Sequence, residues 1–172
     1  MRLTFLGTGT SFGVPQVGCD CAVCRSTDPR DRRTRVGAVV ESEGTRLLID
    51  TPPELRLQLL AVGIHDLDAV VYTHEHADHT HGIDDLRAIS VRRPSGLPIY
   101  GASETLAALA TRFPYIFDDA IRPLPGTSKP EGVARPLTPG EPTRIGALDL
   151  LPFEVPHGTQ RVLGYRIGPS AT

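Results

Sequence analysis

The chain contains the segment Thr73-His74-Glu75-His76-Ala77-Asp78-His79-Thr80-His81-Gly82. This segment follows an almost continuous apolar run at residues 67–72, which is typical of a strand covered on both faces. In extended backbone, side chains two residues apart point to the same side, so His74 and His76 can direct their imidazoles at one point beyond the strand. The pattern predicts half of a metal site.

The remainder of the segment predicts a second point of ligation. If the chain turns there into a helix that starts at Gly82, the turn presents Asp78 and His79 close to the first point. A carboxylate is a hard ligand and an imidazole a borderline one, and together they suit Zn, Mn or Fe in the divalent state. Such crowding of four potential ligands at one strand end favours metal binding over a polar loop with histidines close by chance.

Strand-like and helix-like periods alternate around this segment. Strands are predicted at residues 3–6, 36–41, 46–49, 67–72, 98–100, 147–155 and 162–167. Helices are predicted at residues 53–62, 82–91 and 104–112, the last with Ser103 as its N-cap. The Pro- and Gly-rich residues 114–142 predict a surface excursion with short extended pieces. This alternation indicates an α/β architecture with helices outside sheet layers.

Length and composition limit the class of protein. With 172 residues, 40% apolar and 22% charged, the chain is expected to form a single domain over residues 1–172. The net charge of -2 excludes a basic coat for nucleic acid, although it leaves local patches open. Residues 1–7 lack the order of a signal peptide, and no apolar run is long enough to span a bilayer. We therefore expect a cytoplasmic protein without membrane contact.

The histidine segment resembles the His-x-His-x-Asp-His signature of the metallo-β-lactamase superfamily. Leu3 to Gly9 resembles the opening strand and Gly-Thr-Gly turn of that family, and Leu48-Ile49-Asp50 its strand ending in aspartate. Val155-Pro156-His157-Gly158 is similar to the segment that carries the third histidine of the first metal site. Gly18-Cys19-Asp20-Cys21 with Cys24 is shared with the branch of ribonuclease Z-like enzymes and phosphoribosyl cyclic phosphate phosphodiesterase.

The resemblance assigns metal ligands to particular residues. It implies that His74, His76 and His157 hold a first metal and that Asp78 and His79 hold a second. Two such ions can activate a bridging water and clamp phosphoryl oxygens, and the family also gives Asp78 the catalytic role of orienting the attacking hydroxide. We therefore expect a metal-dependent hydrolase of a small phosphodiester or an RNA end, with Zn²⁺ as the ion and Mn²⁺ or Fe²⁺ as alternatives.

Three further groups have two interpretations each. Cys19, Cys21 and Cys24 favour a structural zinc in an intact protein over three reduced thiols, although the fourth ligand, a C-terminal histidine in the phosphodiesterase named above, has no counterpart. The arginines at positions 30, 32, 33 and 35 could hold a phosphate or form a solvated loop. Asp50 could orient a metal-bound histidine or cap a turn.

The resemblance also predicts that the family's αββα sandwich is incomplete here. In the family, the strand matching residues 164–167 is followed by an aspartate that bridges both metals and later by a histidine, and residues 168–172 hold neither. A homodimer, or a partner chain supplying the missing half, is therefore one expectation. Two other functions stay open: a truncated metal-binding module with weak or no catalysis, and an enzyme of the same superfamily acting on a thioester, sulfonate ester or lactam.

Overall fold

The first six strands of the chain form one mixed sheet. In the computed structural model, which describes residues 1–170, its strands are β1 (Arg2–Gly7), β2 (Gly37–Ser42), β3 (Thr45–Ile49), β4 (Ala69–Val71), β5 (Leu97–Gly101) and β6 (Gly132–Pro136). They lie side by side in chain order, antiparallel from β1 to β3 and parallel from β3 to β6. The β2–β3 hairpin has the predicted place, with Glu43 and Gly44 at positive φ in its turn.

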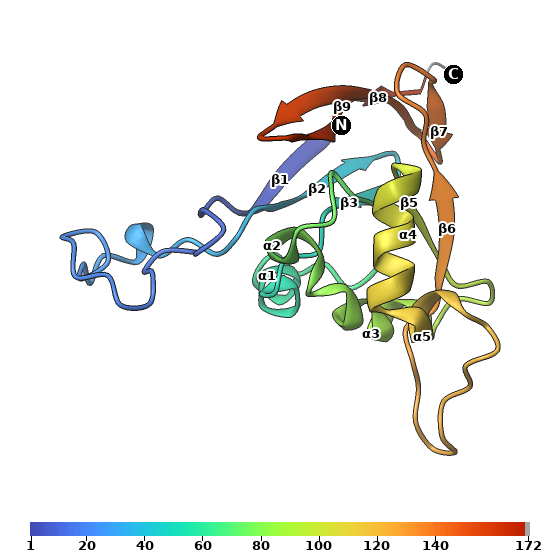
Figure 1. Cartoon of the computed structure of the whole chain (residues 1–172), viewed down its shortest axis with the longest axis horizontal. Helices are drawn as coiled ribbons and strands as arrows, with labels where there is room; N and C mark the ends of the chain where they lie inside the picture. The colour runs from blue at the N-terminus through green and yellow to red at the C-terminus, as the bar shows by residue number, and fades with distance from the viewer. Residues whose placement is uncertain (171–172) are drawn as a thin grey trace.

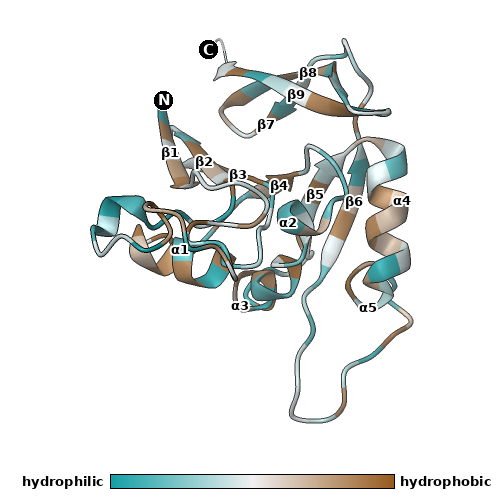
Figure 2. Ribbon diagram, turned by 60° about the vertical axis from the view of Figure 1, so that its left-hand side comes forward, coloured by the Kyte–Doolittle hydropathy of each residue, from teal (hydrophilic) through white to brown (hydrophobic). Residues whose placement is uncertain are grey.

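The helices cover one face of this sheet, as Figure 2 shows. They are α1 (Leu55–Ala61), α2 (Ala77–Thr80), α3 (Arg87–Ser90), α4 (Ser103–Arg112) and α5 (Pro114–Phe117), with 3₁₀ turns η1 (Pro29–Asp31) and η2 (Ile83–Leu86). Crossing a bilayer would require a longer and more apolar helix than any found in residues 1–170. Residues 8–36, called the arm below, extend away from this body between β1 and β2 (Figure 1).

A second, three-stranded sheet packs on the other face of the first. Its strands β7 (Thr143–Ile145), β8 (Leu148–His157) and β9 (Gln160–Pro169) are antiparallel neighbours. Helices on one side of a sheet and a second sheet on the other confirm the predicted α/β class and its layers (Figure 2). Within residues 1–170 the outer face of the second sheet carries no helix.

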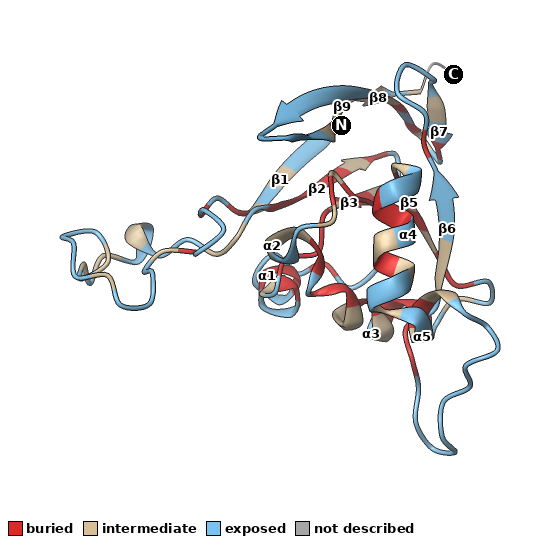
Figure 3. Cartoon of the chain, in the orientation of Figure 1, coloured by how far each residue is buried: buried red, intermediate tan, exposed pale blue. Residues whose placement is uncertain are grey.

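Strand β3 shows how the sequence joins the three layers. Successive side chains of a strand point to opposite faces, so Leu48 enters the core under the helices and Leu47 the core between the sheets. Both are 0% exposed, and burying a leucine fully stabilises the fold by about 1.5–3 kcal/mol. The buried residues in Figure 3 gather in the central strands and on the helices beside them.

Some predicted elements differ from the structure. Ser103 is the first residue of α4 rather than its N-cap, because Ala102 takes the extended conformation before the helix and no side chain caps it. The helix predicted at residues 82–91 is divided into η2 and α3. The excursion at residues 114–142 contains α5 and β6, and β7 begins directly after it. Strand β6 is largely exposed, so backbone pairing with β5 forms it rather than an apolar pattern.

The end of the histidine segment is pressed against the chain that follows β3. A Cβ atom at Gly82 would lie 2.0 Å from the Pro52 carbonyl oxygen, and the Gly82 N–H donates to the Thr51 carbonyl over 2.9 Å. We predict that Gly82→Ala lowers the free energy of unfolding by about 1–3 kcal/mol, measured by urea denaturation. Gly168→Ala, where the added carbon meets nothing within 4 Å, should stay within about 0.5 kcal/mol of the parent. Equal stability of the two variants would contradict this close approach.

Candidate metal centre

Three imidazoles converge at the C-terminal end of β4. His74 and His76 lie on the loop that follows β4, and His157 is the last residue of β8. Their possible ligand atoms all lie within 4.8 Å of one another. The ring centroids are 4.5 Å apart for His74 and His76, 5.1 Å for His74 and His157, and 5.4 Å for His76 and His157. The structure thus brings together the three side chains assigned to the first metal.

Two hydrogen bonds hold the β8–β9 hairpin against this loop. The Leu163 N–H donates to the Thr73 carbonyl over 2.9 Å, and the Tyr165 hydroxyl donates to the Tyr72 carbonyl over 2.6 Å. Burial raises the pKa of Tyr165, so its hydroxyl keeps the proton that it donates. Because β9 pairs with β8 along its whole length, these bonds also position His157.

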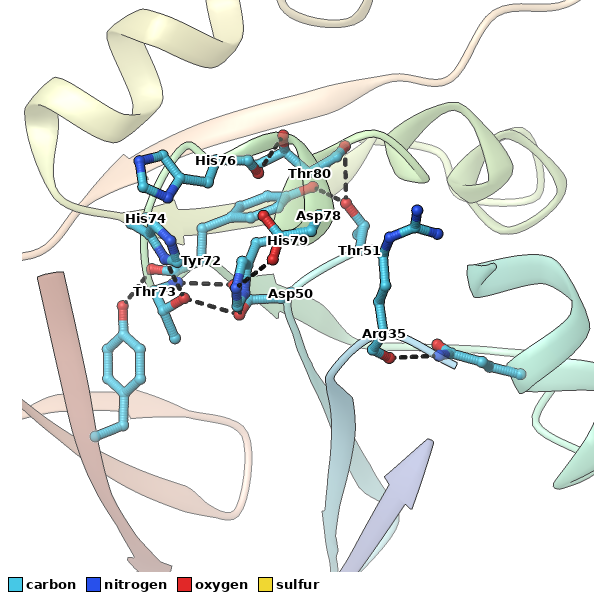
Figure 4. A network of polar contacts seen from close by, with 12 residues as sticks. Arg35, Asp50, Thr51, Tyr72, Thr73, His74, His76, Asp78, His79 and Thr80 are labelled. Carbon is cyan, nitrogen blue, oxygen red and sulfur yellow. Dashed lines mark hydrogen bonds and ion pairs between the residues drawn. The ribbon is translucent and has the colours of Figure 1, made fainter. Parts of the chain in front are cut away.

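The Asp50 carboxylate ties the loop to the end of β3. Asp50 is 2% exposed and takes a left-handed φ of 61°, which aspartate tolerates better than most residues. Its Oδ1 accepts from the Thr73 N–H at 2.8 Å, and its Oδ2 accepts from the Thr73 hydroxyl at 2.8 Å and pairs with His79 Nδ1 at 2.7 Å (Figure 4). Of the two roles open for Asp50, the structure thus shows the contact with a candidate ligand histidine.

Asp78 and His79 lie on α2, beside the first group. The His79 and His74 ring centroids are 4.2 Å apart, and His79 Nε2 is 3.4 Å from Asp78 Oδ2. Two other residues of the segment contact the C-terminal end of α4. His81 is exposed and packs edge-on against Phe113, with 5.8 Å between ring centroids, and the Glu75 carbonyl accepts from Arg112. The second group therefore offers one carboxylate and one imidazole.

These donors fit a divalent metal. His74 Nδ1 is hydrogen-bonded to the Thr73 hydroxyl at 2.9 Å and His79 Nδ1 to Asp50, so each ring leaves Nε2 available. Metal-binding histidines commonly have their second nitrogen fixed in this way. Three imidazoles are a known donor set for zinc with one position left open. The first group thus offers the three donors of such a zinc site, and the second offers two further candidate donors.

The histidines differ in their readiness to take a proton. Burial lowers the pKa of His74 to about 4, and the nearby charge of His79 adds to this effect. Burial also acts to lower the pKa of His79, but the hydrogen bond and the negative charge of Asp50 outweigh it and raise that pKa above its ordinary value. His74 therefore keeps a free lone pair at neutral pH, as a metal ligand must.

The three cysteines form a separate group on the arm. Their sulfur atoms lie within 4.8 Å of one another, and the group contains no fourth histidine, cysteine, aspartate or glutamate from residues 1–170. The Gln16 N–H donates to Cys24 Sγ over 3.3 Å. The pKa of Cys21 falls to about 7, because the Cys24 N–H donates to its sulfur and the thiols of Cys19 and Cys24 also bond to it. A structural zinc here stays a prediction.

The arginine run is largely used to hold the arm together. Arg30 forms an ion pair with Asp28 at 2.6 Å, and Arg33 donates to the Thr8 hydroxyl over 3.2 Å. Arg35 donates to the Ser11 carbonyl over 2.8 Å and also pairs with Glu54. Three of the four arginines therefore have partners within the protein, and phosphate contact by the run stays a prediction.

Sequence reasoning missed Thr73, Tyr72 and Tyr165. Thr73 directly follows the predicted strand at residues 67–72, and it contacts Asp50, His74 and the hairpin. The Tyr72 hydroxyl lies 2.7 Å from Thr51 Oγ1 inside the core. The one available signal was the position of Thr73 and Tyr72 directly before the histidines.

The pKa directions predict a pH titration of the metal-free chain. In an NMR titration, His74 should stay neutral until the pH nears about 4. The ordinary pKa of a histidine is about 6.5, and His79 should take up its proton at a higher pH than that. In Asp50→Asn the pKa of His79 should fall, because the carboxylate charge is lost while burial remains. Asparagine tolerates the left-handed φ of this position. If the pKa of His79 is the same in Asp50→Asn as in the parent, the Asp50 carboxylate is not what raises it.

The chain is similar to several known proteins. A family model described as a beta-lactamase superfamily domain matches residues 45–172. An octanoyltransferase of Porphyromonas gingivalis is 43% identical over 99% of the chain, and a ribonuclease Z of Bradyrhizobium is 29% identical over 95% of it. The chain spans 34% and 48% of the length of these two proteins.

Solved structures have the same fold. A diphosphatase from the PhnP family matches 96% of the chain with a TM-score of 0.85 and 41% identity, and the chain covers 61% of that protein. Zinc-bound PqqB from Methylobacterium extorquens matches 98% of the chain with a TM-score of 0.77 and 22% identity, with 59% of that protein covered. The resemblance found in the histidine segment is confirmed, and the chain belongs to the beta-lactamase superfamily.

Proposed function

We propose that the chain carries the metal-binding site of a hydrolase that cleaves phosphodiester bonds with a metal-activated water. The observation that carries this proposal is the convergence of three imidazoles within 4.8 Å, with Asp78 and His79 beside them. The substrate we propose is a small phosphodiester or an RNA end.

The residues of the site have distinct tasks in this reaction. His74, His76 and His157 would hold a divalent ion, which would act as a Lewis acid and lower the pKa of a water so that hydroxide is available at neutral pH. His74 offers the lone pair of its Nε2, because its Nδ1 is engaged by Thr73. Asp78 is 23% exposed at its side chain, so its carboxylate can orient the attacking water and accept its proton. Asp50 keeps His79 facing Asp78.

The bond to be cleaved is inferred from the related proteins. The names diphosphatase and ribonuclease Z both denote cleavage of phosphorus–oxygen bonds. The name octanoyltransferase denotes a different reaction, but the alignment covers 34% of that protein and does not identify which part transfers the acyl group. The shared phosphorus chemistry therefore supports a phosphodiester over a thioester, sulfonate ester or lactam.

Zinc is the ion we propose. Imidazole nitrogen is a preferred ligand of zinc, and PqqB, which shares the fold, binds Zn²⁺. The first group should hold it more tightly than the second, since three ligands converge there and two at the second. Mn²⁺ and Fe²⁺ are the alternatives at the second position, where a carboxylate contributes.

Substitution of the third histidine tests the proposal. We predict that His157→Ala lowers zinc content and reduces kcat/KM for bis(4-nitrophenyl) phosphate by about 100-fold or more, since even partners of metal ligands cost 10- to 100-fold. His65→Ala is the matched control, because His65 is exposed outside the site. Metal content is measured by mass spectrometry and turnover by nitrophenolate release.

The same assay separates the alternatives. Zinc binding without turnover of any ester would favour an inert metal-binding module. Turnover of a thioester in preference to the phosphodiester would favour the other branch of the superfamily. A chain that turns over the phosphodiester equally well with and without His157 would exclude the proposed site.

A further inference from the structure

We infer that Thr73 is a positioning residue that joins the three chain segments of the metal centre and sets the tautomer of His74. The inference depends on the metal centre of the proposed function, but not on its substrate. No step of it requires the identity of the bond that is cleaved.

Thr73 makes four hydrogen bonds to three different parts of the chain. Its N–H and its hydroxyl both donate to the Asp50 carboxylate, each over 2.8 Å. Its Oγ1 lies 2.9 Å from His74 Nδ1 (Figure 4), and its carbonyl accepts from Leu163 N–H at 2.9 Å. One residue thus contacts the end of β3, a histidine of the first group and the hairpin that carries His157.

The direction of these bonds determines which nitrogen of His74 is free. The Asp50 carboxylate only accepts, so the Thr73 hydroxyl must donate its single proton to Oδ2. The hydroxyl oxygen can then only accept from the imidazole, which places the ring proton on Nδ1. Nε2 of His74 is left with its lone pair, the form that binds a metal.

The hydrogen bond to Thr73 distinguishes His74 from the other two histidines of the first group. Within residues 1–170, the rings of His76 and His157 have no hydrogen bond to the protein, so His74 is the ring of the first group with a fixed orientation. Thr73 also acts on the second group, since both its donors hold the carboxylate that pairs with His79. The effect on His79 is indirect and should be the smaller one.

The test compares Thr73→Val, which keeps the shape and removes the hydroxyl, with Thr73→Ser, which keeps the hydroxyl. Zinc is titrated into the ¹⁵N-labelled chain, and long-range ¹H–¹⁵N correlations report the tautomer and metal binding of each histidine. We expect Thr73→Val to weaken zinc binding at His74 by about 10- to 100-fold, as for other partners of metal ligands. Binding at His79 should change less, and Thr73→Ser should restore most of the affinity.

Thr45→Val is the matched control. Thr45 is 8% exposed, and its hydroxyl accepts from the Ala147 N–H over 2.9 Å, so it also joins the two sheets without touching the histidines. Its valine variant should lose stability in thermal unfolding while keeping its zinc affinity. A merely structural role of Thr73 would give Thr73→Val this same behaviour and would overturn the inference.

The tautomer in the metal-free parent chain is an independent measurement. A proton on Nδ1 of His74 supports the inference, and a proton on Nε2 overturns it, even if Thr73→Val does not fold. If the parent takes up no zinc at the histidines, the proposed function fails, while this measurement still decides the role of Thr73. If the parent binds zinc and Thr73→Val binds it equally well, only the inference fails.

Discussion

The Asp50 carboxylate is the constraint on which the arrangement of the histidines depends. An ionised carboxylate that is 2% exposed would cost several kcal/mol if it lacked partners. It has three, which come from the backbone and hydroxyl of Thr73 and the ring of His79. Loss of any of these donors would leave the buried carboxylate short of one partner. The three hydrogen bonds therefore fix the end of β3, the histidine loop and α2 relative to one another. The hairpin with His157 contacts the same loop through the carbonyls of Tyr72 and Thr73.

Much of this arrangement could be predicted from local sequence. The spacing of His74 and His76 follows from extended backbone, and the Glu43-Gly44 turn from the need for positive φ in a tight hairpin. Leu47 and Leu48 belong to the strand predicted at residues 46–49 as part of a hairpin. Each of these features is decided by residues within one or two positions of one another. The meeting of His157 with the others came from the family resemblance instead.

Other features are decided by contacts that sequence patterns do not contain. Strand β6 exists because β5 offers a free edge, and its own residues are mostly exposed. The start of α4 depends on the conformation of Ala102 rather than on the capping preference of Ser103. Thr73, on the loop after β4, and Tyr165, within β9, show no distinctive local pattern, and their roles follow only from partners 23 and 93 residues away. Long-range pairing therefore accounts for most of what was missed.

The arm has an evolutionary consequence. Its base is fastened by two isolated bridges, Gly9 with Arg35 and Val14 with Arg33, and the backbone hydrogen bonds of residues 15–32 remain within the arm. Insertions, deletions or exchanged residues in that outer part would therefore leave the imidazoles and the sheets undisturbed. Descendants of this fold could diversify the arm freely and acquire or lose its thiols. Residues of the histidine loop could change far less, because they contact Asp50 and the β8–β9 hairpin.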